Sequence, residues 1–253
     1  MSDDAKMRDK KEGGFWDTVK VLVEALLIAL IIRTFLFQPF NIPSGSLIPT
    51  LLVGDYLFVS KYSYGYSKHS FPFSPDLFQG RIWSAEPKRG DIAVFKLPKD
   101  NSTDYIKRLV GLPGDRIQMI DGVLHINNTP VQRERIADFE TADSWGRPSR
   151  FPRYRETLPN GVSYTVIERD GDRGYWDNTK VYVVPQGHYF MMGDNRDNST
   201  DSRDDNSVGP VPLENFVGRA EIIFFSIEEG ESAWQIWRWP VSVRWSRLFQ
   251  TIK

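Results

Sequence analysis

The chain begins with a nearly continuous run of apolar residues, whereas the remainder alternates short apolar runs with turn residues. The first run extends over Val19–Phe37. As a helix it would be roughly 28 Å long, close to the hydrocarbon thickness of a bilayer, which predicts a transmembrane anchor. Lys20, Glu24 and Arg33 oppose insertion, and a buried amphipathic helix is the alternative.

The flanks of the run indicate its orientation. Gln38-Pro39-Phe40 stands where a cleavable signal peptide would have a small-x-small site, so we expect no cleavage there. Basic residues are frequent before the run, and after Arg33 the next one is Lys61. The positive-inside rule then predicts a cytoplasmic segment 1–14, an anchor at 15–37 and an exported remainder.

Beyond the first run, short apolar segments alternate with turns rich in Gly and Pro, as is typical of β-strands. Asp121-Gly122 lies between two such segments and predicts a hairpin. The pattern predicts a mainly β fold, with folded antiparallel sheets or a barrel-like core behind one helix. We expect strands at 55–62, 92–96, 105–110, 117–120, 123–126, 181–184, 188–192 and 217–227.

Two regions differ in composition from the predicted strands. The region 133–179 is rich in charge, Pro and Gly, and we expect a variable extension or small subdomain there. The tail 231–253 mixes Trp with Arg, which suits a membrane interface, although its aromatic residues could instead pack on the β domain.

Composition excludes several classes of function. The 253 residues include 32 basic and 33 acidic ones, so the chain has no overall charge that would recruit nucleic acid. It has no cysteine, which excludes disulfides and thiolate chemistry. Its three histidines form no HExxH-like pattern, and we expect neither a metal nor another cofactor.

The residues best suited to chemistry are serines and a lysine. Ser44 and Ser46 lie in a proline-bracketed turn just after the apolar run. A serine nucleophile needs a base, and without a His-Asp arrangement that base would be a lysine. Only about 0.04% of an ordinary lysine is neutral at pH 7, so the base must be buried in an apolar strand. Lys107 fits, whereas Arg108 cannot deprotonate; the alternative for Lys107 is an ordinary lysine at a strand end.

The acidic loop 194–205 has the density of carboxylates seen in calcium loops. Arg196 falls at a ligand position, Ser199 stands where an EF-hand needs Gly, and no Glu ends the loop. We therefore reject an EF-hand and expect side chains that cap a tight loop.

Taken together, these segments resemble the bacterial type I signal peptidase family, the membrane-bound serine proteases that remove signal peptides. The most specific element is the string GDNRDNSTDSR at Gly193–Arg203. The resemblance implies a β-rich catalytic core at 38–115 and 186–230, interrupted by a second β subdomain inserted at 116–185. The region 133–179 lies outside the resemblance. The matching segments are the apolar run, 43–51, 89–96, 105–116 and 193–203.

The resemblance implies roles residue by residue. Ser46 matches the nucleophile and Lys107 the general base. Ser44 matches a hydroxyl that forms the oxyanion hole with the backbone N–H of Ser46, and Ser199 matches the serine that orients the lysine. The structural ion pairs implied near the site involve Arg108, Asp194, Asp201 and Arg203. We expect the substrate pocket to be lined by Phe40, Ile42, Leu51, Tyr105 and Ile106.

The implied activity is cleavage of exported preproteins after Ala-x-Ala-like sites through an acyl-enzyme. The implied partners are signal peptides and the lipid bilayer, with no nucleic acid, and the implied state is a monomer. The implied location is the bacterial inner membrane, with one membrane pass and a periplasmic catalytic domain. Leu47 replaces the usual methionine after the nucleophile, and Ser207-Val208-Gly209 replaces an aromatic-Gly pair.

Two other functions remain open. A self-cleaving Ser-Lys repressor would need a DNA-binding helix pair, where this chain has an apolar run. A non-catalytic, membrane-tethered β module would tolerate loss of Ser46 and Lys107.

Overall fold

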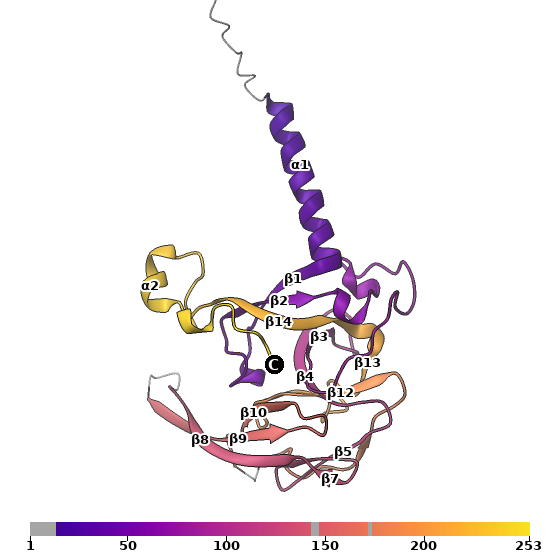
Figure 1. Ribbon diagram of the computed structural model, residues 1–253, viewed down its shortest axis with the longest axis vertical. Coiled ribbons are helices and arrows are strands. Elements are labelled where there is room, and N and C mark those ends of the chain that lie inside the picture. Colours follow the sequence, from indigo (N-terminus) through magenta and orange to yellow (C-terminus); the bar gives the residue numbers. More distant parts are fainter. Residues whose placement is uncertain (1–13, 143–146, 172–173) are drawn as a thin grey trace, which may run out of the picture.

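The fold is mainly β, with antiparallel sheets behind one N-terminal helix, as the sequence predicts. The computed structural model describes residues 14–142, 147–171 and 174–253, so the predicted segment 1–14 lies outside the described residues except for Gly14. Figure 1 shows the helix projecting from one end of the sheets, with the C-terminus returning to the middle of the molecule.

The N-terminal helix is shorter than predicted. Helix α1 spans Phe15–Ile31, a π-helical turn follows at Ile32–Leu36, and Phe37 already belongs to a strand. The 17 residues of α1 are about 25 Å long, less than the ~30 Å of a bilayer core. Among the residues described, no helix combines the length and apolarity that a membrane crossing requires.

The largest sheet has seven strands in the order β1-β2-β14-β3-β4-β12-β13. Its inner side chains form a core cluster that includes Leu57, Val94 and Ile223. In this sheet Ala93 pairs with Lys107, which places the lysine in the interior of the sheet. The strands are β1 (Phe37–Asn41), β2 (Asp55–Ser60), β3 (Ile92–Lys96), β4 (Asp104–Gly111), β12 (His188–Met192), β13 (Val211–Pro212) and β14 (Phe216–Ser226).

Two smaller sheets come from the chain between β4 and β12. One contains β11 (Tyr182–Val183), β5 (Arg116–Ile120), β6 (Val123–Ile126) and β7 (Thr129–Pro130). The other contains β10 (Ser163–Ile167), β9 (Pro148–Thr157) and β8 (Gln132–Ala142). The strands therefore divide close to the predicted borders of the inserted subdomain, and the division into domains stays a prediction.

The predicted hairpin is confirmed, because β5 and β6 pair on either side of Asp121 and Gly122. Both turn residues have positive φ, 47° and 73°, the conformation that favours Asp-Gly there. By contrast, the sequence predicted no strand over β8 and β9. Most of the described β9 side chains are exposed or only half-buried, so this pair has no strong apolar alternation.

The C-terminal tail returns to the large sheet. Within it α2 spans Trp239–Ser242, and the Trp239 ring lies 5.1 Å from that of Phe225. Arg247 forms an ion pair with buried Asp55 at 2.5 Å. The tail is thus packed on the β domain, while Trp234, Trp237 and Trp245 are exposed.

Candidate functional site

Ser46 lies in a short 3₁₀ turn, Gly45–Leu47, between β1 and β2. The next residue, Leu47, is buried in the core of the large sheet and anchors the turn. Ser46 itself is 7% exposed. Because one neighbour is fixed in the core, the serine hydroxyl is held at the edge of a cavity of about 480 Å³.

Lys107 on β4 reaches this serine. Its Nζ donates a hydrogen bond to Ser46 Oγ at 2.7 Å and another to the Ile106 carbonyl at 3.1 Å. Lys107 is 4% exposed, and burial lowers its pKa to about 8, although the carboxylates of Asp201 and Asp194 oppose that shift. At pH 7 about a tenth of Lys107 is then neutral, over a hundredfold more than for an ordinary lysine.

The loop 193–203 holds the serine turn in place. The backbone N–H of Asn195 donates to the Ser46 carbonyl at 3.1 Å, and its side-chain amide donates to the Gly45 carbonyl at 3.0 Å. Gly193 lies so close that a Cβ there would stand 2.6 Å from the Ser46 carbonyl oxygen and 2.3 Å from Ser199 Oγ. Only glycine permits this approach, which explains the first residue of the string.

The two other predicted serines line the same cavity. Ser44 is exposed at the N-terminal end of the turn. Ser199 is 8% exposed, and its Oγ has no hydrogen-bond partner among the described residues. The structure therefore brings four predicted residues together, Ser44, Ser46, Lys107 and Ser199, without a hydrogen bond from Ser199 to the lysine among the contacts of the described chain.

The first predicted ion pair lies directly behind the site. Arg108 Nε and Nη2 donate to the two carboxylate oxygens of Asp194, each at 2.8 Å. The side chains are 0% and 1% exposed. Thr50 Oγ1 also donates to Asp194 at 2.5 Å, so this bidentate pair connects β4, the acidic loop and the segment after the nucleophile.

The second predicted pair closes the acidic loop on itself. Arg203 Nε and Nη2 donate to Asp201 at 2.9 Å each, and the Gly193 N–H donates to the same carboxylate at 2.9 Å. Burial raises the pKa of Asp201, but the Arg203 guanidinium and these hydrogen bonds outweigh it and hold the pKa below its ordinary value. Asp201 is therefore a carboxylate that fixes Gly193.

The predicted pocket residues separate into two groups. Tyr105 and Ile106 line the cavity beside Lys107. Ile42 and Leu51 are buried in the core cluster, at 3% and 0% exposure, and Phe40 packs against that cluster. The structure thus places these last three outside the cavity lining. The cavity also includes Trp176, which sequence reasoning missed because it lies in the insert.

Sequence reasoning also missed a buried ion pair between β9 and the acidic loop. Arg196 donates to the two oxygens of Glu156 at 3.0 and 2.5 Å, and the Tyr164 hydroxyl donates to Glu156 at 2.8 Å. Both charged side chains are almost fully buried. The only signal for Glu156 was a charge in a region without apolar pattern, so the pair could not be found from sequence.

A second buried lysine lies away from the serine. Lys61 is 1% exposed and donates to the His69 carbonyl at 3.4 Å. Burial lowers its pKa to about 7. Lys61 is thus buried and has a lowered pKa, as a lysine base requires, but it does not contact Ser46. A variant of Lys61 can therefore serve as a control for a variant of Lys107.

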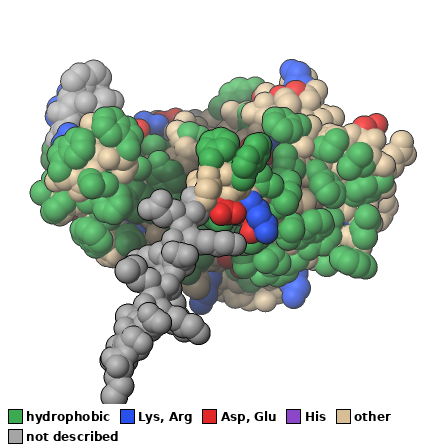
Figure 2. Space-filling view, turned by 90° about the horizontal axis from the view of Figure 1, so that it is seen from above, with side chains coloured by type: hydrophobic (Ala, Val, Ile, Leu, Met, Phe, Trp, Pro, Cys, Tyr) green, Lys and Arg blue, Asp and Glu red, His purple; other side chains and the backbone are tan. Residues whose placement is uncertain are grey.

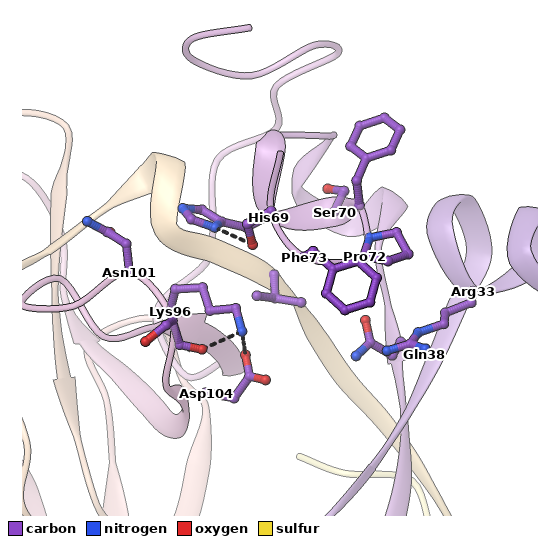
Figure 3. A pocket seen from close by; sticks show the side chains of 13 residues that line it. Arg33, Gln38, His69, Ser70, Pro72, Phe73, Lys96, Asn101 and Asp104 are labelled. Carbon is purple, nitrogen blue, oxygen red and sulfur yellow. Dashed lines mark hydrogen bonds and ion pairs between the residues drawn. The ribbon is translucent and has the colours of Figure 1, made fainter. Parts of the chain in front are cut away.

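Near Lys61 a smaller cavity of about 210 Å³ lies at the foot of α1 (Figure 3). Arg33 lies at one side of it and His69 at another, and Lys96 forms an ion pair with Asp104 at 3.0 Å. Asp104 also lines the larger cavity. Among the described residues the serine–lysine contact occurs in the larger cavity, which we take as the candidate active site.

Comparison with known proteins identifies a matching family, two similar sequences and one similar structure. The family model described as signal peptidase, peptidase S26, matches residues 15–225. Signal peptidase I of Rickettsia typhi is 42% identical over 249 residues, covering 90% of both chains. Signal peptidase I of Rickettsia akari is 42% identical over 248 residues, covering 90% of this chain and 89% of that one. A crystal structure of a signal peptidase I from Enterococcus faecalis is 24% identical, with a TM-score of 0.32, over 53% of this chain and 97% of the other.

Proposed function

Because this chain belongs to the signal peptidase family, peptidase S26, and is therefore a peptidase, we propose that it removes signal peptides from preproteins through a Ser46–Lys107 dyad. The observation that carries the proposal is the 2.7 Å contact between Ser46 Oγ and Lys107 Nζ in a buried setting. That setting lowers the pKa of Lys107 to about 8, so the lysine can accept a proton near neutral pH.

The first half of the reaction forms an acyl-enzyme. Neutral Lys107 takes the Ser46 proton as Ser46 Oγ attacks the scissile carbonyl carbon. The Ser46 backbone N–H and the Ser44 hydroxyl donate hydrogen bonds to the oxyanion that develops. The tetrahedral intermediate collapses, and the Lys107 ammonium gives its proton to the leaving amine of the mature protein.

The second half releases the signal peptide. Lys107, neutral again, takes a proton from water, and the hydroxide attacks the ester carbonyl. Collapse breaks the bond to Ser46 Oγ, which recovers its proton from Lys107. Ser199, whose buried Oγ lines the same cavity, is the group proposed to orient the ammonium during these transfers.

The cavity supports a preference for small side chains. Tyr105 and Ile106 adjoin Lys107, and Trp176 contributes a further large ring to the lining. We propose that these wall residues restrict the side chain accepted next to Ser46, which favours Ala-x-Ala-like sites. Efficient cleavage after Leu or Phe would contradict this proposal.

Contact with lipid is a further part of the proposal. None of the described residues of α1 is buried against the rest of the protein. The exposed apolar side chains of this helix include Leu26, Leu27 and Ile28. Figure 2 shows apolar side chains over much of the face from which α1 projects. Binding of the chain to liposomes, with loss of binding when 15–31 is deleted, is the expected result. The membrane topology and periplasmic location stay predictions.

The test is cleavage of a purified preprotein by the detergent-solubilised chain, beside Ser46→Ala and Lys107→Ala. We expect the wild type alone to cut after the small-x-small site. Cutting by either variant would exclude the dyad. Failure of the wild type to cut would favour the non-catalytic β module instead.

A further inference from the structure

Three carboxylates beside the catalytic cavity take no part in the proposed reaction. Glu168 follows β10, Asp177 lies before β11, and Asp197 belongs to the acidic loop. One oxygen from each lies within 4.8 Å of the others. Glu168 and Asp177 are 0% and 1% exposed, and Asp197 is partly buried. Crowding of buried negative charge is unfavourable unless cations lie nearby, and the Arg133 guanidinium, 2.9 Å from Glu168, supplies positive charge at one side of the cluster.

The hydrogen bonds of two of these carboxylates leave one oxygen for the centre of the cluster. Arg133 donates to Glu168 Oε1 at 2.9 Å. The backbone N–H groups of Arg169 and Asp170 donate to Asp197 Oδ2 at 2.6 and 2.8 Å. The other oxygens, Glu168 Oε2 and Asp197 Oδ1, are buried and have no hydrogen-bond partner in the part of the chain that the structure describes.

The backbone is shaped to bring the cluster together. Gly174 passes so close to Asp197 that a Cβ at this glycine would lie 2.1 Å from Asp197 Oδ1 and 3.2 Å from Asp177 Oδ2. The N–H of Gly174 donates to Asp177 Oδ2 at 2.6 Å. A side chain at 174 would fill the space beside the carboxylates, so this glycine keeps that space open.

We propose that Glu168, Asp177 and Asp197 bind a calcium ion. Ca²⁺ takes oxygen ligands at about 2.3–2.6 Å, so two oxygens on one ion can be up to ~5 Å apart, which accommodates the 4.8 Å limit of this cluster. Carboxylate oxygens without nitrogen or sulfur also favour a hard cation over zinc. Asp197 lines the catalytic cavity, so water from that side can complete the coordination.

The three proposed ligands lie far apart in sequence, which explains why comparison with the EF-hand loop motif could not reveal this site. The EF-hand comparison considers one continuous loop, whereas these carboxylates come from three segments that only the fold brings together. A bound ion would connect the insert to the loop that carries Ser199. It would also fix the neighbouring Trp176, which lines the same cavity.

The direct test is terbium luminescence on the full chain after treatment with a chelator. Tb³⁺ substitutes for Ca²⁺, and Trp176 lies next to Asp177 in sequence, so tryptophan excitation should sensitise its emission. We expect saturation at one ion per chain and displacement by CaCl₂. Glu168→Gln should weaken binding roughly tenfold or more. Asp205→Asn, an exposed acid that pairs with Lys180, is the matched control and should bind as the wild type does.

The opposite results are equally clear. Absence of saturable emission, or equal binding by wild type and Glu168→Gln, would overturn the proposal. A thermal-unfolding arm covers the case in which Glu168→Gln does not fold. There the wild-type melting temperature should rise with CaCl₂ but not with NaCl of equal ionic strength, and an equal response to both salts would overturn the proposal.

Discussion

Replacement of Lys107 by methionine should make the protein more stable at neutral pH while it abolishes cleavage. Burial lowers the pKa of Lys107 from its ordinary value of 10.5 to about 8. At pH 7 the folded protein must therefore hold a buried ammonium. The difference between the two pKa values corresponds to a loss of about 3 kcal/mol in the free energy of unfolding. Methionine retains the apolar stem without the charge.

The sign and range of the pH dependence follow from linkage. Between pH 8 and pH 10.5 the unfolded chain binds more protons at this lysine than the folded chain, so wild-type stability rises with pH. The cost falls from about 3 kcal/mol at pH 7 to about 1.4 kcal/mol at pH 9.5. The Lys107→Met variant avoids this cost but also loses the hydrogen bond to Ser46, which reduces its increase in unfolding free energy by about 1 kcal/mol at either pH.

The assay is urea unfolding of wild type and Lys107→Met at both pH values, with cleavage measured in parallel. The free energy of unfolding of Lys107→Met should exceed that of the wild type, and we expect this difference to be about 2 kcal/mol smaller at pH 9.5 than at pH 7. Lys61→Met is the matched control, because Lys61 is also buried with a lowered pKa but lies away from Ser46. It should gain stability at pH 7 and keep activity. An advantage of Lys107→Met that stays constant or widens with pH would refute the reasoning.

Three other predictions concern the same site. The value of kcat/KM should rise with pH through an apparent pKa of about 8, since neutral Lys107 is the base; a flat profile from pH 6 to pH 9 would contradict this. Gly193→Ala should lower kcat at least about a hundredfold, because its Cβ displaces the Ser46 carbonyl, and unchanged kinetics would oppose that packing. Arg108→Met should destabilise the fold by about 3–5 kcal/mol by leaving buried Asp194 unpaired; in denaturant titrations, a loss below ~1 kcal/mol would show that the pair matters little.

The sequence predicted those parts of the molecule in which local pattern and structure agree. An apolar run located β3, apolar residues flanking Lys107 and Arg108 located β4, and Asp-Gly located the hairpin between β5 and β6. The helix ends at Leu36, one residue before the predicted end, but its last turn, Ile32–Leu36, is π-helical and not α-helical. Hydropathy does not record that change of backbone conformation.

The parts that could not be predicted depend on contacts between distant segments. Glu156 pairs with Arg196 across 40 positions of sequence, and although Arg196 belongs to the string 193–203, no local pattern marks Glu156 as its partner. Strands β8 and β9 are partly exposed, so their residues lack the alternation that identifies a half-buried strand. Trp176 lines the candidate cavity from the insert, within the region 133–179 that none of the motifs recognised in the sequence covers.

The central claim is that Ser46 becomes acylated with Lys107 as its base. The most direct measurement is intact-protein and peptide mass spectrometry after rapid acid quench of the chain with an Ala-x-Ala ester substrate. We expect an acyl adduct on Ser46 in the wild type and none in Ser46→Ala, with adduct formation by Lys107→Met slowed at least about a hundredfold. An adduct on another residue, or unchanged acylation in Lys107→Met, would contradict the account.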